Sequence, residues 1–146
     1  MYQVPRYTIS LVREGSVGVE NKMARDSTTA RDILSPLFDG LDREQFVTMA
    51  LDAKHQAIGI NVVSVGSLTV SIVHPREVFK PAILLNAAAV IVGHNHPSGD
   101  TTPSPEDHAL TKRLQEVGKN LGIPLLDHLV LGDQGSFWSF ADQGLL

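Results

Sequence analysis

The chain of 146 residues has a net charge of -4 and contains no cysteine, which excludes disulfides, thiolate nucleophiles and metal sites built on sulfur. Its content of 42% hydrophobic and 19% charged residues is ordinary for one globular domain. The basic residues are scattered along the chain, which argues against direct binding of nucleic acid, because such binding normally requires a basic patch.

The sequence predicts neither a membrane span nor a secretory signal. The longest apolar run, residues 87–93, is far shorter than the roughly 20 residues that a membrane-spanning helix needs. The first residues contain no apolar stretch followed by a small-residue cleavage site. We therefore expect a cytoplasmic protein with no membrane partner.

The start of the chain is expected to differ from the rest. Residues 1–26 are irregular in pattern and predict an arm that could be mobile, with a short strand at residues 7–12. Residues 27–146 predict the folded domain. Its first helix is expected over residues 30–38, with Ser27-Thr28-Thr29 offering N-caps.

The remaining elements follow from apolar runs and turn residues. Helices are predicted to begin at Pro75, a residue that suits the first helical position, and at Ser104, with the second helix ending near Leu121. Strands are predicted at residues 46–52, 58–65, 68–73, 89–92, 125–131 and 136–140. This order of elements predicts an α/β fold, in which helices pack on both sides of a mixed sheet.

Two histidines follow the predicted strand at residues 89–92. Side chains at positions i and i+2 of an extended chain point to the same side, so His94 and His96 can converge on one metal ion. Asp107, in the first turn of the next helix, is the best third ligand, because the Gly- and Pro-rich loop lets that helix fold back over the strand tip. Two imidazoles and one carboxylate leave a fourth position on zinc for water, which is typical of a catalytic site.

The residues at the start of the predicted helix also fit a purely structural role. Ser104-Pro105-Glu106-Asp107 is a good helix capping box even without a metal. We expect a carboxylate that binds a metal to be a poor capping group at the same time. A metal-activated water also needs a general base, usually a carboxylate. Glu44, just before the first long strand, is one candidate, and spacing alone does not select it over Glu77.

The spacing of these residues is also that of a known signature. His94-x-His96, seven residues, Ser104, two residues and Asp107 resemble the JAMM, or MPN+, metalloprotease motif. The sequence of residues 94–100, together with Asp127-His128 downstream, is similar to that of the bacterial RadC family. The resemblance implies a cytidine-deaminase-like α/β sandwich that binds one Zn²⁺ per chain.

The resemblance further implies an activity and two catalytic residues. The domain would be a zinc metallopeptidase or isopeptidase acting on a peptide or protein substrate. Glu44 would act as general base and then as general acid, and Ser104 would help bind the oxyanion of the tetrahedral intermediate. Two alternatives remain: a DNA-repair-associated factor of the RadC type, and a non-enzymatic protein-binding MPN module.

Four further residues are candidates for supporting roles. Asp127 and His128 could orient a ligand imidazole, or they could face solvent and bond locally. Ser98 and Asp100 lie in the loop of the motif and could contact substrate, although forming the turn is the simpler role for both.

Overall fold

A computed structural model describes residues 1–66 and 73–146 of the chain. The strand predicted at residues 68–73 lies outside the described residues except for its last position. In chain order the elements are α1 (Ser27–Leu34), the 3₁₀ turn η1 (Ser35–Leu37), β1 (Gln45–Leu51), β2 (Ala57–Val65), α2 (Pro75–Leu84), β3 (Ala89–Asn95), α3 (Pro105–Leu121), β4 (Leu125–Leu131) and β5 (Phe137–Ser139).

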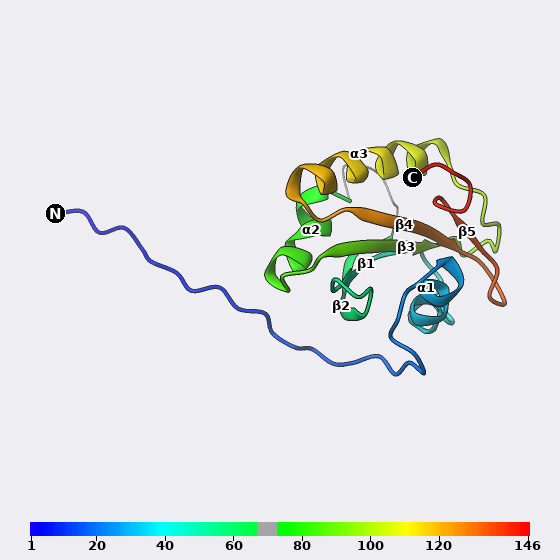
Figure 1. The fold of residues 1–146 in the computed structure, drawn as a ribbon, viewed down its shortest axis with the longest axis horizontal. Helices are drawn as coiled ribbons and strands as arrows, with labels where there is room; N and C mark the ends of the chain where they lie inside the picture. The colour runs from blue at the N-terminus through cyan, green and yellow to red at the C-terminus, as the bar shows by residue number, and fades with distance from the viewer. Residues whose placement is uncertain (67–72) are drawn as a thin grey trace.

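The five strands form one mixed sheet in the order β2-β1-β3-β4-β5. β1 runs antiparallel to β2 and β3, β3 runs parallel to β4, and β5 runs antiparallel to β4. α1 covers one face of the sheet, and α2 and α3 cover the other (Figure 1). The predicted α/β fold with a mixed sheet is confirmed, and β3 at its centre is buried along its whole length.

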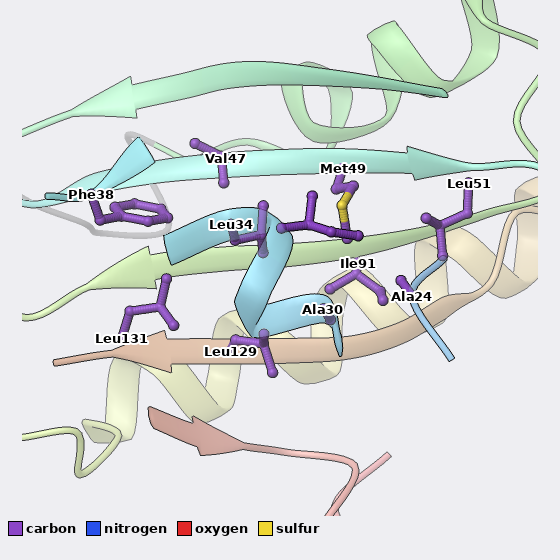
Figure 2. Packing of buried hydrophobic residues seen from close by; sticks show 11 residues of the cluster. Ala24, Ala30, Leu34, Phe38, Val47, Met49, Leu51, Ile91, Leu129 and Leu131 are labelled. Carbon is purple, nitrogen blue, oxygen red and sulfur yellow. The ribbon is translucent and has the colours of Figure 1, made fainter. Parts of the chain in front are cut away.

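An apolar cluster fills the space between α1 and the sheet. Side chains from α1 point toward alternate residues of β1, β3 and β4, as Figure 2 shows. The cluster consists of Ala24, Ala30, Ile33, Leu34, Phe38, Val47, Met49, Leu51, Ile91, Leu129 and Leu131.

A second apolar cluster lies under α2 and α3 on the opposite face. It consists of Phe46, Val73, Val78, Phe79, Ala82, Val90, Val92, Leu110, Leu114, Ile123 and Leu125. α3 ends at Leu121 and is capped by Gly122, whose φ of 74° is in the left-handed region that glycine adopts without steric cost. Both faces of β3 are thus covered, and its C-terminal end is held in place by packing on each side.

The N-terminal arm differs in part from the prediction. Residues 1–22 form no helix or strand, so the strand predicted at residues 7–12 is wrong; the segment is exposed and extends away from the sheet (Figure 1). The N-cap of α1 is Asp26, which forms a capping box with Thr29, rather than one of the residues that begin the helix.

The first helix is also shorter than predicted. α1 ends at Leu34, and the chain continues as η1 with Pro36 in its first turn, because proline cannot donate the hydrogen bond that a continuous helix requires. Within residues 1–66 and 73–146, no helix combines the length and the apolar composition needed to cross a bilayer.

Candidate metal centre

Three side chains converge where β3 ends and α3 begins. Nε2 of His94 lies 3.3 Å from Oδ1 of Asp107, and Nε2 of His96 lies 3.4 Å from Oδ2 of the same carboxylate. The two Nε2 atoms are 3.2 Å apart. These ligand atoms all lie within 4.8 Å of one another, so the cluster could hold a metal ion.

Burial differs between the two histidines. The side chain of His94 is 0% exposed and that of Asp107 is 6% exposed, whereas that of His96 is 15% exposed. β3 places His94 in the interior and His96 just beyond the last residue of the strand. The most solvent-exposed side of the cluster is therefore the side of His96.

Asp107 caps α3 and faces the histidines at the same time. Its Oδ2 accepts a hydrogen bond from the backbone N–H of Ser104 at 2.8 Å, while the hydroxyl of Ser104 accepts from the N–H of Asp107 at 3.1 Å. One carboxylate thus completes the capping box and also faces both histidines. A carboxylate has two oxygens with about four acceptor positions, so the cap occupies only part of its capacity.

The orientation of His96 is fixed by a backbone group. Its Nδ1 lies 2.7 Å from the carbonyl oxygen of Asp100, and because a carbonyl only accepts, this nitrogen carries the proton. In the neutral ring the lone pair is then on Nε2, the atom that faces Asp107. Loop residues therefore support the ligand, and the Asp100 carboxylate itself accepts from the N–H of Thr102 at 3.0 Å.

Ser98, the other loop candidate, also takes part in the turn. Its hydroxyl accepts a hydrogen bond from the N–H of Asp100 at 3.4 Å, and its side chain is exposed. The structure thus places both loop candidates in turn-forming bonds.

The electrostatics of the cluster favour a positive charge at its centre. The hydrogen bond to Asp107 raises the pKa of His96, and burial only partly opposes this effect. Burial alone would raise the pKa of Asp107, but the adjacent imidazoles of His94 and His96 outweigh it and hold that pKa well below its ordinary value. Two imidazole nitrogens and a carboxylate are also ligands that zinc accepts readily, so the residues present fit a divalent metal.

Glu44 lies directly before β1 and is half-buried. Its negative charge contributes to the raised pKa of His96, so its electric field reaches the cluster. The competing candidate Glu77 lies in the first turn of α2 and forms an ion pair with Lys80 at 2.8 Å. The structure therefore favours Glu44 over Glu77 as the carboxylate associated with the cluster.

Asn95 holds the backbone on both sides of Glu44, a role that the sequence did not reveal. Its Oδ1 accepts a hydrogen bond from the N–H of Gln45 at 2.8 Å, and its Nδ2 donates to the carbonyl of Arg43 at 3.1 Å. Asn95 is buried and stands between the two histidines in the chain, so its side chain points away from theirs. A short polar residue between two candidate ligand histidines was the available signal.

Asp127 and His128 are both buried but contact different parts of the protein. Asp127 accepts hydrogen bonds from the N–H groups of His128 and Ala141 and from the hydroxyl of Ser139, so it anchors the C-terminal segment. Burial raises its pKa, although these three bonds oppose the effect.

His128 does contact a candidate ligand. Its Nε2 lies 2.8 Å from Nδ1 of His94, and its Nδ1 lies 2.6 Å from the hydroxyl oxygen of Thr111. Burial holds the pKa of His128 well below its ordinary value, so the ring is neutral near pH 7. Of the two predicted orienting residues, His128 is the one placed to act on a ligand; Thr111 was missed, because a threonine within a helix carries no signal of its own.

Comparisons with known proteins agree with this geometry. Residues 24–145 match the family described as the RadC-like JAB domain. A UPF0758 protein of Moorella thermoacetica is 55% identical over 119 residues, which cover 80% of this chain and 52% of that protein. A UPF0758 protein of Symbiobacterium thermophilum is 54% identical over 115 residues, which cover 79% of this chain and 49% of that protein.

A third relative matches a somewhat shorter part of the chain. The UPF0758 protein of Methanosarcina acetivorans is 54% identical over 104 residues, which cover 71% of this chain and 45% of that protein. The chain thus spans about half the length of the curated relatives it matches. These names describe no reaction, so an activity must be argued from the residues of the cluster.

Proposed function

The chain belongs to the RadC-like JAB domain family, and from this premise we propose that it is a zinc-dependent hydrolase that cleaves a peptide or isopeptide bond. The observation that carries the proposal is the convergence of His94, His96 and Asp107 on one point. Two imidazoles and one carboxylate leave a coordination position open, as catalytic zinc sites do. When bound, the ion would lower the pKa of a water toward about 7 and polarise the scissile carbonyl.

Glu44 supplies the proton transfer in this proposal. Its carboxylate accepts the proton of the attacking water and later delivers it to the leaving amine. Support comes from its position immediately before β1 and from its electrostatic effect on His96. The two backbone hydrogen bonds made by Asn95 keep this stretch of chain in place.

Ser104 supplies a hydrogen bond to the oxyanion. Its hydroxyl oxygen already accepts from the N–H of Asp107, so its own proton stays available to donate. The residue is half-buried at the start of α3, next to the third ligand. Removing one oxyanion donor typically costs about 10²–10³-fold in kcat.

The test compares the wild type with Glu44→Gln and, as a matched control, Glu77→Gln. Each protein is assayed for zinc content and for hydrolysis of a quenched peptide library and an isopeptide-linked lysine substrate. We expect all three to hold one zinc, and we expect Glu44→Gln alone to lose about 10²-fold or more of its turnover.

Two outcomes would contradict the proposal. Full activity of Glu44→Gln would remove Glu44 from the reaction. A wild-type protein that takes up no zinc, or that holds zinc but cleaves neither substrate, would instead favour a non-enzymatic MPN module.

A further inference from the structure

His128 on β4 is a buried histidine that lies behind the candidate metal ligands. Phe140 stacks on its ring with centroids 4.9 Å apart, and the edge contact with Phe46 has centroids 5.6 Å apart. Within the part of the chain that the structure describes, its polar partners are His94 and Thr111, one at each ring nitrogen. Packing therefore fixes the ring, and each nitrogen has one defined partner.

Thr111 sets the direction of these hydrogen bonds. Its hydroxyl oxygen lies 2.7 Å from the backbone carbonyl oxygen of Asp107, one turn earlier in α3. A carbonyl oxygen only accepts, so the single hydroxyl proton of Thr111 must be donated to Asp107. The hydroxyl can then only accept from His128, and Nδ1 of His128 must carry a proton.

The same argument extends from His128 to His94. A neutral imidazole protonated on Nδ1 has its lone pair on Nε2, so His128 accepts a hydrogen bond from Nδ1–H of His94. His94 then has its own lone pair on Nε2, the atom that faces Asp107 and His96. The opposite direction would place a proton on that atom and block it as a ligand.

We propose that Thr111 and His128 are positioning residues that hold His94 in the tautomer able to bind the metal. Thr111 belongs to α3 and His128 to β4, so the chain of bonds also links the helix that carries Asp107 to the strand beside His94. Metal-ligating histidines usually bond their second nitrogen to a carboxylate, a carbonyl or water. Here a second imidazole takes that place. The inference rests on the proposed function, because the tautomer matters only if Nε2 of His94 is a ligand.

The test uses the full chain with Thr111→Val, which removes the hydroxyl and keeps the shape, and Thr111→Ser, which keeps the hydroxyl as a matched control. Long-range ¹H–¹⁵N NMR of the metal-free proteins reports which ring nitrogen of each histidine is protonated. Competition with a chromogenic chelator reports the affinity for Zn²⁺.

We expect His94 to be protonated on Nδ1 in the wild type and in Thr111→Ser. In Thr111→Val we expect a mixture of tautomers and a zinc affinity about 10–100-fold weaker, the usual cost of losing an outer hydrogen-bond partner. Thermal unfolding of each variant establishes that it is folded.

The results distinguish this inference from the proposed function. A proton on Nε2 of His94 in the metal-free wild type would overturn the inference even if no variant folded. So would a Thr111→Val protein with unchanged tautomers and unchanged zinc affinity. A wild-type protein that binds no zinc would defeat the proposed function, while the NMR result would still report the tautomer.

Discussion

Asp127 and His128 are neighbours on β4, yet they serve opposite faces of the sheet. Asp127 lies on the same face as Leu129 and Leu131 of the α1 cluster, and it anchors the C-terminal segment through Ser139 and Ala141. His128 points to the α3 face, where it contacts Thr111 and a candidate metal ligand. Because side chains alternate along a strand, Asp127 stabilises the C-terminal segment, whereas its neighbour His128 contacts the metal cluster.

The difference lies in where each network ends. The carboxylate of Asp127 accepts three hydrogen bonds from nearby groups, so its network closes around it. The imidazole of His128 accepts at one nitrogen and donates at the other, so its network continues to Nε2 of His94. A network that closes on itself stabilises the fold, whereas one that ends at Nε2 of His94 directs a lone pair toward the candidate metal position.

The largest effect is expected from removing the third ligand. The zinc affinity of Asp107→Ala should fall by much more than the roughly 10–100-fold that is lost with a hydrogen-bond partner of a ligand, because here a coordinating atom itself is removed. It should also lose about 1 kcal/mol of stability with the cap. Asp107→Asn is the control, since its side-chain oxygen can still cap. Metal analysis and thermal unfolding measure both quantities, and wild-type zinc affinity in Asp107→Asn would contradict the assignment.

The next effect should appear at Asn95, whose substitution by alanine removes the side-chain partner of two half-buried backbone groups. We expect Asn95→Ala to lose roughly 1–3 kcal/mol of stability. A displacement of Glu44 by about 1 Å should also lower turnover about 10²-fold without weakening zinc binding.

Asn95→Asp is the matched control for this prediction. It keeps the acceptor for Gln45 but loses the donor to Arg43, so we expect an intermediate result. Denaturant unfolding, steady-state kinetics and zinc titration separate the three quantities. Wild-type turnover in Asn95→Ala would show that Asn95 does not position the base.

The opposite pattern is expected at Asp127 on β4. Asp127→Ala leaves three donors without an acceptor, so we expect a loss of about 2–3 kcal/mol in the free energy of unfolding. Zinc affinity should stay unchanged, because none of the three groups that bond to Asp127 belongs to a candidate ligand. Urea unfolding and chelator competition provide the measurements, and a parallel loss of zinc affinity would show that the two networks are coupled.

The parts of the molecule that could be predicted from sequence depend on local pattern. The spacing of His94 and His96 on an apolar strand and the capping residues of α3 are visible within a few residues, so the elements and the cluster that they bring together were predicted. The strand expected at residues 7–12 fails because a β pattern needs a partner strand, and these six residues have none among the described residues.

The supporting residues depend on packing between distant segments. Asn95 bonds to a residue 50 positions away, and Thr111 meets His128 only because α3 folds back on β4. The direction of the hydrogen bonds also cannot be read from composition, because it follows from which groups can only accept. These relations appear once the sheet order and the side-chain contacts are known.

The smallest effect is expected for Asp127→Asn, measured as the pH dependence of the free energy of unfolding. Asp127→Asn should be well tolerated, since its oxygen can accept the two N–H bonds and its amide can donate to Ser139.

Burial raises the pKa of Asp127 above its ordinary value of 3.8, so the folded state holds that proton more tightly than the unfolded state does. The stability that the protonated group contributes is complete below pH 3.8 and is lost as the pH rises through the folded pKa. Asparagine does not titrate, so the stability of Asp127→Asn relative to wild type should increase over that interval and then level off. Urea unfolding of both metal-free proteins across this range measures the difference, and a decrease with pH would mean that the three donors outweigh burial.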